Sequence, residues 1–239
     1  MKNLKFRVLM VLLITIINMK NMSAQSNNQH LDAKEQGIIA IAAFTANGDQ
    51  EKLKSALNSG LDKGLMVNEI KEVLVQLYAY CGFPRSLNGI TTFMAVLDER
   101  AAKGVHDQAG PEATKVAGTN KYEKGSKTLE ELTGKSQSGP LNGANAFAPG
   151  IDTFLKEHLF ADIFGRGVLT YKQRELATIT VLATLPGLGS QLQSHIGMGM
   201  NTGLTEAQLR EAFSILEKNI GKTQADAANT VLNQALTSK

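Results

Sequence analysis

The sequence predicts an all-α fold built from two similar helical units. Apolar residues recur at i, i+3, i+4 and i+7 in several segments, which is the spacing of an amphipathic helix face. Aromatic residues make up 5% of the 239 residues and tryptophan is absent. The core must therefore consist of Leu, Ile, Val, Ala and Met, which suits packed helices better than a β-sandwich.

The chain also nearly repeats itself. Residues 53–82, which begin LKSALNSGLDKG, align with residues 192–221, which begin LQSHIGMGMNTG. Three pairs keep a separation of 139 positions: Gly64 and Gly203, Ile70 and Leu209, and Gly82 and Gly221. We expect function where the two copies differ, and the clearest difference is His195, whose counterpart is Ala56.

Residues 1–24 have the pattern of a secretory signal peptide. Basic Lys2, Lys5 and Arg7 precede an apolar run over 8–17, and Ser23-Ala24 ends the segment. A run of ten residues is too short to span a bilayer. We expect export, to the periplasm, without membrane attachment after cleavage; an uncleaved anchor is the alternative.

Cleavage would change the charge of the protein. It removes four basic residues and no acidic ones, so the balance moves from +3 to 21 basic against 22 acidic residues, or −1. Nothing then indicates binding to nucleic acid. Cys81 is the only cysteine, which excludes an internal disulfide and a CxxC pair.

The first unit is predicted over residues 32–101. Asp32, with a glutamate three positions on, forms a helix-capping pattern. Apolar faces then predict helices that include Ile38, Leu53 and Ile70. Gly82-Phe83-Pro84 breaks the third helix, and a further helix follows to about residue 101.

Residues 102–150 form a connecting segment rich in Gly, Ser, Asn and Ala, with one predicted helix over Tyr122–Leu132. The second unit is predicted over residues 151–239, with Thr170 and Thr205 as helix caps. Its predicted helices cover Ile151–Leu159, Tyr171–Leu185, Gln191–Asn201, a segment after Thr205, and Thr223–Leu236.

Glu175 and His195 are the strongest candidates for chemistry. Glu175 lies about ten residues before the turn at Pro186, and His195 about nine after it. In two antiparallel helices these positions reach similar heights. A histidine held by a carboxylate is an acid or base suited to neutral pH. The alternative is a buried Glu–His pair that only ties two helices together.

Other polar residues have two interpretations each. Arg174 is either a bidentate partner for a substrate carboxylate or an ordinary surface arginine. Cys81 is either a small buried residue at a helix end or a nucleophile. His106 and His158 have no evident partners and are predicted on the surface. No metal site is expected, because Glu175 and His195 alone supply too few ligands.

Two stretches carry a family resemblance: Leu77–Ile90 (LYAYCGFPRSLNGI) and Arg174–Phe213, which begins RELATITVLATLPG. They resemble the carboxymuconolactone decarboxylase family of the alkylhydroperoxidase-D-like superfamily, as does Asn120–Gly125. The resemblance covers nearly all of residues 32–239. It implies a duplicated all-α bundle and a homo-oligomer, with a trimer of this tandem chain as the expected assembly.

The resemblance also implies a reaction. The founding enzyme decarboxylates a γ-lactone diacid without metal or organic cofactor. The matching residues would be Glu175 and His195 for proton transfer and Arg174 near a carboxylate. Tyr80 and Arg85 are candidate substrate-binding groups that the first unit would add to the same cavity. We therefore expect a cofactor-free lyase or isomerase that acts on a small carboxylate or lactone.

Two alternatives stay open. The redox branch of the superfamily uses a Cys-x-x-Cys close to the family histidine, whereas Gln191–His195 contains no cysteine. A peroxidase activity would have to use Cys81 with an external reductant. The third possibility is a non-catalytic oligomeric binding module.

Overall fold

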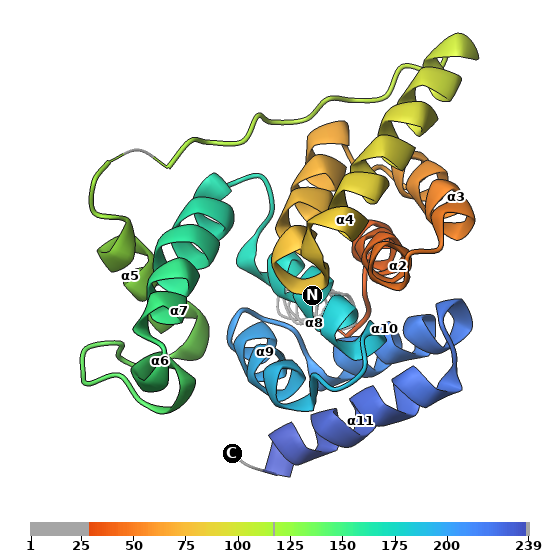
Figure 1. The fold of residues 1–239 in the computed structure, drawn as a ribbon. Coiled ribbons are helices and arrows are strands. Elements are labelled where there is room, and N and C mark those ends of the chain that lie inside the picture. The colour runs from red at the N-terminus through yellow and green to blue at the C-terminus, as the bar shows by residue number, and fades with distance from the viewer. Residues whose placement is uncertain (1–28, 117, 238–239) are drawn as a thin grey trace, which may run out of the picture.

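The computed structural model of the chain describes residues 29–116 and 118–237. Every regular element within these ranges is helical, which confirms the all-α prediction (Figure 1). No helix in the described ranges is long and apolar enough to cross a membrane. The predicted signal peptide over residues 1–24 lies outside the described residues.

The first unit contains α2 (Ala33–Asn47), α3 (Gln50–Asp62) and α4 (Val67–Ala102). Asp32 caps α2, with its side chain accepting a hydrogen bond from the Glu35 amide at 2.8 Å. Gly82 interrupts α4 with a φ of 81°. The element is therefore two helices that meet at a kink, as the Gly-Phe-Pro sequence predicts.

The second unit contains α8 (Tyr171–Thr184), α9 (Gly189–Asn201), α10 (Glu206–Asn219) and α11 (Lys222–Thr237). The bounds of α9 follow those of α3 by 139 residues, and the start of α10 follows that of α4 by the same interval. The start of α8 follows that of α2 by 138 residues. The duplication that the sequence predicts is thus a duplication of helices.

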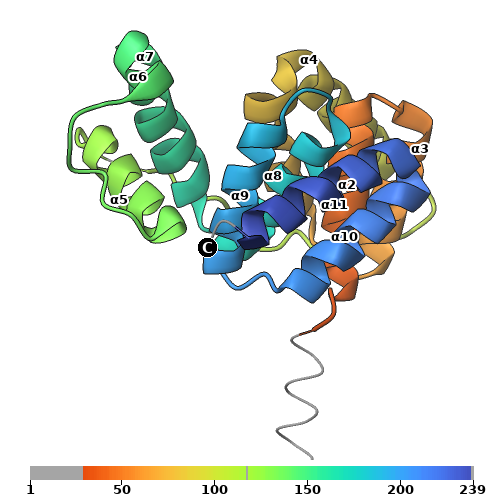
Figure 2. The same cartoon turned by 90° about the horizontal axis from the view of Figure 1, so that it is seen from below.

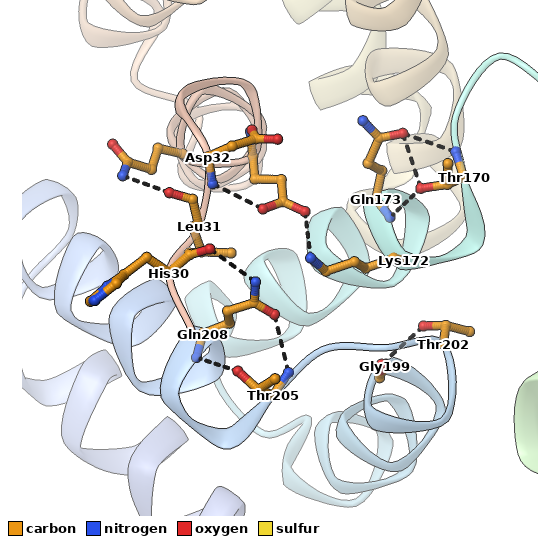
Figure 3. A network of polar contacts seen from close by, with 12 residues as sticks. His30, Leu31, Asp32, Thr170, Lys172, Gln173, Gly199, Thr202, Thr205 and Gln208 are labelled. Carbon is orange, nitrogen blue, oxygen red and sulfur yellow. Dashed lines mark hydrogen bonds and ion pairs between the residues drawn. The ribbon is translucent and has the colours of Figure 1, made fainter. Parts of the chain in front are cut away.

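Helix caps repeat in the same way. Asp32 and Thr170 both form capping boxes with the residue three positions on, Glu35 and Gln173. Figure 3 shows these contacts side by side, together with the Thr205–Gln208 box at the start of α10. Capping satisfies amide groups that have no partner within the helix, so the same device sets the start of equivalent helices.

Further helical segments lie between α4 and α8: α5 (Lys121–Thr133), α6 (Gly143–Phe147), α7 (Pro149–Thr153), the π-helix η1 (Phe154–Ile163) and the 3₁₀ turn η2 (Phe164–Arg166). The predicted Ile151–Leu159 helix is therefore part of a longer helical run. α5 packs along η1, and the pair stands to one side of the main bundle (Figures 1 and 2).

The two units share one interior. α2 and α8 pack against each other, α4 of the first unit packs on α8, and α10 of the second packs on α2. Ala177 and Val181 of α8 belong to the core of the first unit. Ile39 and Ala43 of α2 belong to the core of the second. Residues of α4 therefore face the helices that carry Glu175 and His195.

Candidate active site

The structure brings Glu175 of α8 and His195 of α9 together. The Nδ1 atom of His195 lies 2.7 Å from Oε2 of Glu175. The Glu175 side chain is fully buried, and 10% of the His195 side chain is exposed. The short turn between the two helices contains Gly187, which has a φ of 79°. The contact agrees with the equal distances of both residues from that turn.

A glycine allows this close approach of α8 and α9. Gly199 lies one turn after His195, and a Cβ there would lie 2.9 Å from the Cδ1 atoms of Ile179 and Leu204. The same Cβ would lie 3.7 Å from the Cβ of Glu175. Because Gly199 has no side chain, α9 can pack closely against α8, which carries Glu175.

Tyr80 of α4 completes the group from the other unit. Its ring stands edge-on to the His195 ring, with centroids 5.6 Å apart and an interplanar angle of 83°. Burial, and then the charge of Glu175, raise the pKa of Tyr80 far above its ordinary range. The hydroxyl therefore stays protonated and can donate a hydrogen bond.

Two buried polar atoms beside His195 have no hydrogen-bond partner within the described part of the chain. They are the Tyr80 hydroxyl and Oε1 of Glu175. The Thr178 hydroxyl accepts a hydrogen bond from Nε2 of Gln76 at 2.9 Å and still has its own proton to donate toward Tyr80, which offsets part of the rise in the Tyr80 pKa. Buried polar groups almost always have a partner, so these two atoms are candidates for hydrogen bonds with a small polar molecule.

Arg174 lies in a different set of contacts. It is fully buried, with Nη2 3.1 Å from Oε2 of Glu72 and Nη1 2.9 Å from Oε1 of Gln76. Nε of Arg166 donates to both Glu72 oxygens at 2.9 Å. The alternative prediction, that Arg174 is an ordinary surface arginine, is therefore wrong. Its binding of a substrate carboxylate stays a prediction, because its Nη atoms are directed to α4.

The partners of Arg174 come from α4 and were not predicted from the sequence. Glu72, Gln76 and Tyr80 lie four residues apart on α4, so they share one face of the helix. That face meets α8, where Gln76 Nε2 also donates to the Arg174 carbonyl at 2.9 Å. Polar residues four positions apart, at Glu72, Gln76 and Tyr80, among the apolar residues of this part of α4 are the signal that could have indicated them.

Cys81 and Arg85 lie on either side of the kink in α4. The Cys81 thiol donates to the Leu77 carbonyl oxygen at 3.2 Å. Burial raises the pKa of this thiol to about 11, and the Arg85 charge offsets only part of that effect. Arg85 is half-buried, and its predicted contact with substrate stays a prediction.

His106 and His158 are both exposed, as predicted, and His158 also has partners that the sequence analysis did not identify. Nε2 of His158 contacts the Tyr78 hydroxyl, and Nδ1 lies 3.5 Å from Oδ2 of Asp162. The Tyr78 partner comes from α4, against which η1 packs, so that contact could not be read from neighbouring sequence, whereas Asp162 lies four residues after His158. Between residues 29 and 237, with residue 117 left aside, no group of three or more His, Cys, Asp or Glu could hold a metal ion.

Comparison with known proteins supports the resemblance. The model of the carboxymuconolactone decarboxylase family matches the chain twice, over residues 14–91 and 149–234. The first match begins within the apolar run predicted to be a signal peptide. None of the curated proteins matches the chain significantly. The two matches together cover more than half of the sequence, and the chain therefore belongs to the carboxymuconolactone decarboxylase family.

Proposed function

We propose that the protein is a cofactor-free lyase or isomerase that moves a proton on a small carboxylate or lactone. The observation that carries the proposal is the 2.7 Å contact between the buried Glu175 carboxylate and Nδ1 of His195. Family membership supports a carboxymuconolactone decarboxylase-like activity. The substrate is proposed only as a chemical class.

His195 is the proton carrier in this proposal. When Nδ1–H donates to Glu175, the other ring nitrogen, Nε2, holds a free electron pair. Nε2 takes a proton from the substrate, and the Glu175 charge stabilises the imidazolium that forms. The proton then returns to the product carbon or oxygen. The histidine and the carboxylate thus end each turnover in their starting states.

The Tyr80 hydroxyl and Oε1 of Glu175 would orient the substrate. Both atoms are buried without a partner in the described structure, and the raised pKa of Tyr80 keeps its hydroxyl a donor. A developing negative charge on a carbonyl oxygen next to Tyr80 would gain a hydrogen bond in a setting of low dielectric. Protonated substrate oxygens could donate to Glu175.

The two alternatives have weaker support. A peroxidase needs a thiolate, and burial of Cys81 raises the pKa of its thiol to about 11. A non-catalytic module needs no paired acid and base, whereas Glu175 and His195 share a hydrogen bond.

The test is kinetic, with γ-carboxymuconolactone and related lactone acids as substrates. We expect His195→Ala and Glu175→Gln each to lower kcat by about 10²–10⁴. Ser194→Ala is the matched control, because this neighbour on α9 is exposed and its hydroxyl donates only to the Ser190 carbonyl. Wild-type rates in both site variants would reject the proposal.

Export and assembly are further proposals from the sequence. Intact mass of the protein recovered from the periplasm tests cleavage after Ala24, and a mass that retains residues 14–24 would contradict it. Sedimentation equilibrium tests the proposed homotrimer, and a monomer at micromolar concentration would contradict that assembly.

A further inference from the structure

The first unit has a hollow at the position equivalent to the candidate active site. Its volume is about 370 Å³, and it lies between α2, α3 and α10. The helix correspondence places Gly37 at the position of Glu175, Ala56 at that of His195 and Asn219 at that of Tyr80. All three of these residues line the hollow.

The equivalence of the two positions rests on contacts as well as on numbering. A Cβ on Gly60 would meet the Cδ1 atoms of Leu65 and Ile41 at 3.1 and 3.2 Å. A Cβ on its counterpart, Gly199, would meet the Cδ1 atoms of Leu204 and Ile179, which are the counterparts of Leu65 and Ile41. In the first unit the large side chains of the Glu175–His195–Tyr80 group are replaced by smaller ones. The space that those side chains fill at the candidate active site is therefore open here.

The hollow has an apolar floor and positive ends. Phe44, which is 7% exposed, and Ala56 form part of the floor. Lys52 and Lys63 line it from the two ends of α3, and no acidic residue lines it. The Lys52 ammonium lies 5.9 Å from the centre of the Phe44 ring and 3.3 Å from Asp49, outside the lining. Within the described residues Lys63 has no ion pair.

The two lysines share one face of α3. They are eleven residues apart, which is close to three helical turns and corresponds to about 16 Å along the axis. Their side chains are long enough to reach inward from both ends of the hollow. A single carboxylate would satisfy one of them, whereas a molecule with an anionic group at each end would pair with both.

We propose that this hollow binds a small dicarboxylate with an apolar body, as a second site distinct from the Glu175–His195 pair. The apolar body would lie on Phe44, and the carboxylates would face Lys52 and Lys63. The site holds no acid–base pair, so it binds its ligand without converting it. The inference does not depend on the proposed activity.

The experiment is an amide NMR titration of the full chain with suberate as the probe. We expect shifts at Gly37, Ser55 and Ser59, with weaker binding of octanoate and still weaker binding of octane-1,8-diol. Lys52→Gln/Lys63→Gln should raise the Kd about tenfold, since both charge contacts of the ligand are lost. Lys103→Gln/Lys127→Gln makes the same charge change outside the hollow and should leave the Kd unchanged.

Two further variants separate this site from the candidate active site. Ala40→Leu places a larger side chain on the wall of the hollow and should abolish the shifts. His195→Ala should leave them intact, even if it abolishes catalysis. The proposal is overturned if the shifts are absent, if they lie only on α9 around Ser194 and Gly197, or if the diol binds as tightly as suberate.

Discussion

The two units use the same helices to place different chemistry at equivalent positions. Glu175 and His195 of the second unit pack with Tyr80 of the first, and two buried polar atoms there have no hydrogen-bond partner within the described residues. In the first unit, Gly37 and Ala56 contribute to an open hollow. The same backbone arrangement therefore carries a hydrogen-bonded carboxylate and imidazole in one unit and open space in the other.

The same comparison extends to the contacts between the units. Glu72 of α4 binds the buried Arg174, while its counterpart Glu211 of α10 binds Gln36, the counterpart of Arg174. The exposed fraction of the Glu211 side chain is 26%, against 5% for Glu72. One crossing is thus a buried ion pair, and the other is a hydrogen bond from a neutral amide to a partly exposed carboxylate that also contacts His30.

The largest expected effect comes from breaking these equivalent contacts. Glu72→Ala leaves the Arg174 guanidinium buried without its counter-charge, and we expect a loss of about 3–5 kcal/mol in the free energy of unfolding. Glu211→Ala removes hydrogen bonds from Gln36 and the Leu31 amide, for a loss of about 1 kcal/mol. Urea denaturation of both variants checks the difference.

Glu72→Gln serves as the control, because it keeps the shape and a hydrogen-bond acceptor while it removes the charge. Its loss should lie between those of the two alanine variants. Equal losses for Glu72→Ala and Glu211→Ala would show that the two crossings are energetically equivalent, contrary to their burial.

Much of the fold could be predicted from local sequence. The Asp32 and Thr170 caps and the break at Gly82 are chemical signals within a few residues, and the structure has all three. The Glu175–His195 contact was also accessible, because a short turn relates two neighbouring helices by counting residues.

The remaining features depend on packing between distant segments. The Glu72–Arg174 pair forms because α4 crosses into the second unit, and helical periodicity in one segment does not reveal which helix it meets. The hollow depends on small residues in three separate helices, Gly37, Ala56 and Asn219. Their effect is visible only when the duplicate is superposed in space.

A second prediction concerns the helix end before the kink, where Cys81 of the first unit corresponds to Ile220 of the second. Burial raises the Cys81 pKa from 9.0 to about 11, so the thiol stays protonated at neutral pH and can pack as an apolar group. At pH 8 its thiolate fraction, and hence its alkylation by iodoacetamide, should be about 100-fold below that of a free thiol.

Mass spectrometry of the alkylated protein from pH 7 to 10 measures this rate. It should rise about tenfold per pH unit, because the thiolate forms only as the pH approaches the raised pKa. Arg85→Gln should slow the reaction further, since the Arg85 charge lowers the Cys81 pKa. Rapid alkylation at pH 7 would show that the Cys81 thiol is reactive and would favour the peroxidase alternative.

The smallest expected effect comes from adding a methyl group where α3 packs on α2, at Gly60, and where α9 packs on α8, at Gly199. A Cβ on Gly199 would lie 2.9 Å from two side-chain methyl groups, whereas one on Gly60 would lie 3.1 and 3.2 Å from their counterparts. Alanine in a helix gains about 0.5–1 kcal/mol over glycine. We expect Gly60→Ala to be nearly neutral, because the gain offsets the crowding. Gly199→Ala should lose about 1 kcal/mol in urea denaturation.

Gly199→Ala should also act on the site, while Gly60→Ala should not. The new methyl group would press on the helix face that carries Glu175, whose Cβ lies 3.7 Å away, and would move the carboxylate relative to His195. Small displacements of a reacting group can lower a rate far more than they lower stability. A fall in kcat with Gly199→Ala alone would show that turnover depends on the geometry of the Glu175–His195 pair. An equal fall with Gly60→Ala would show instead that general loosening of the bundle sets the rate.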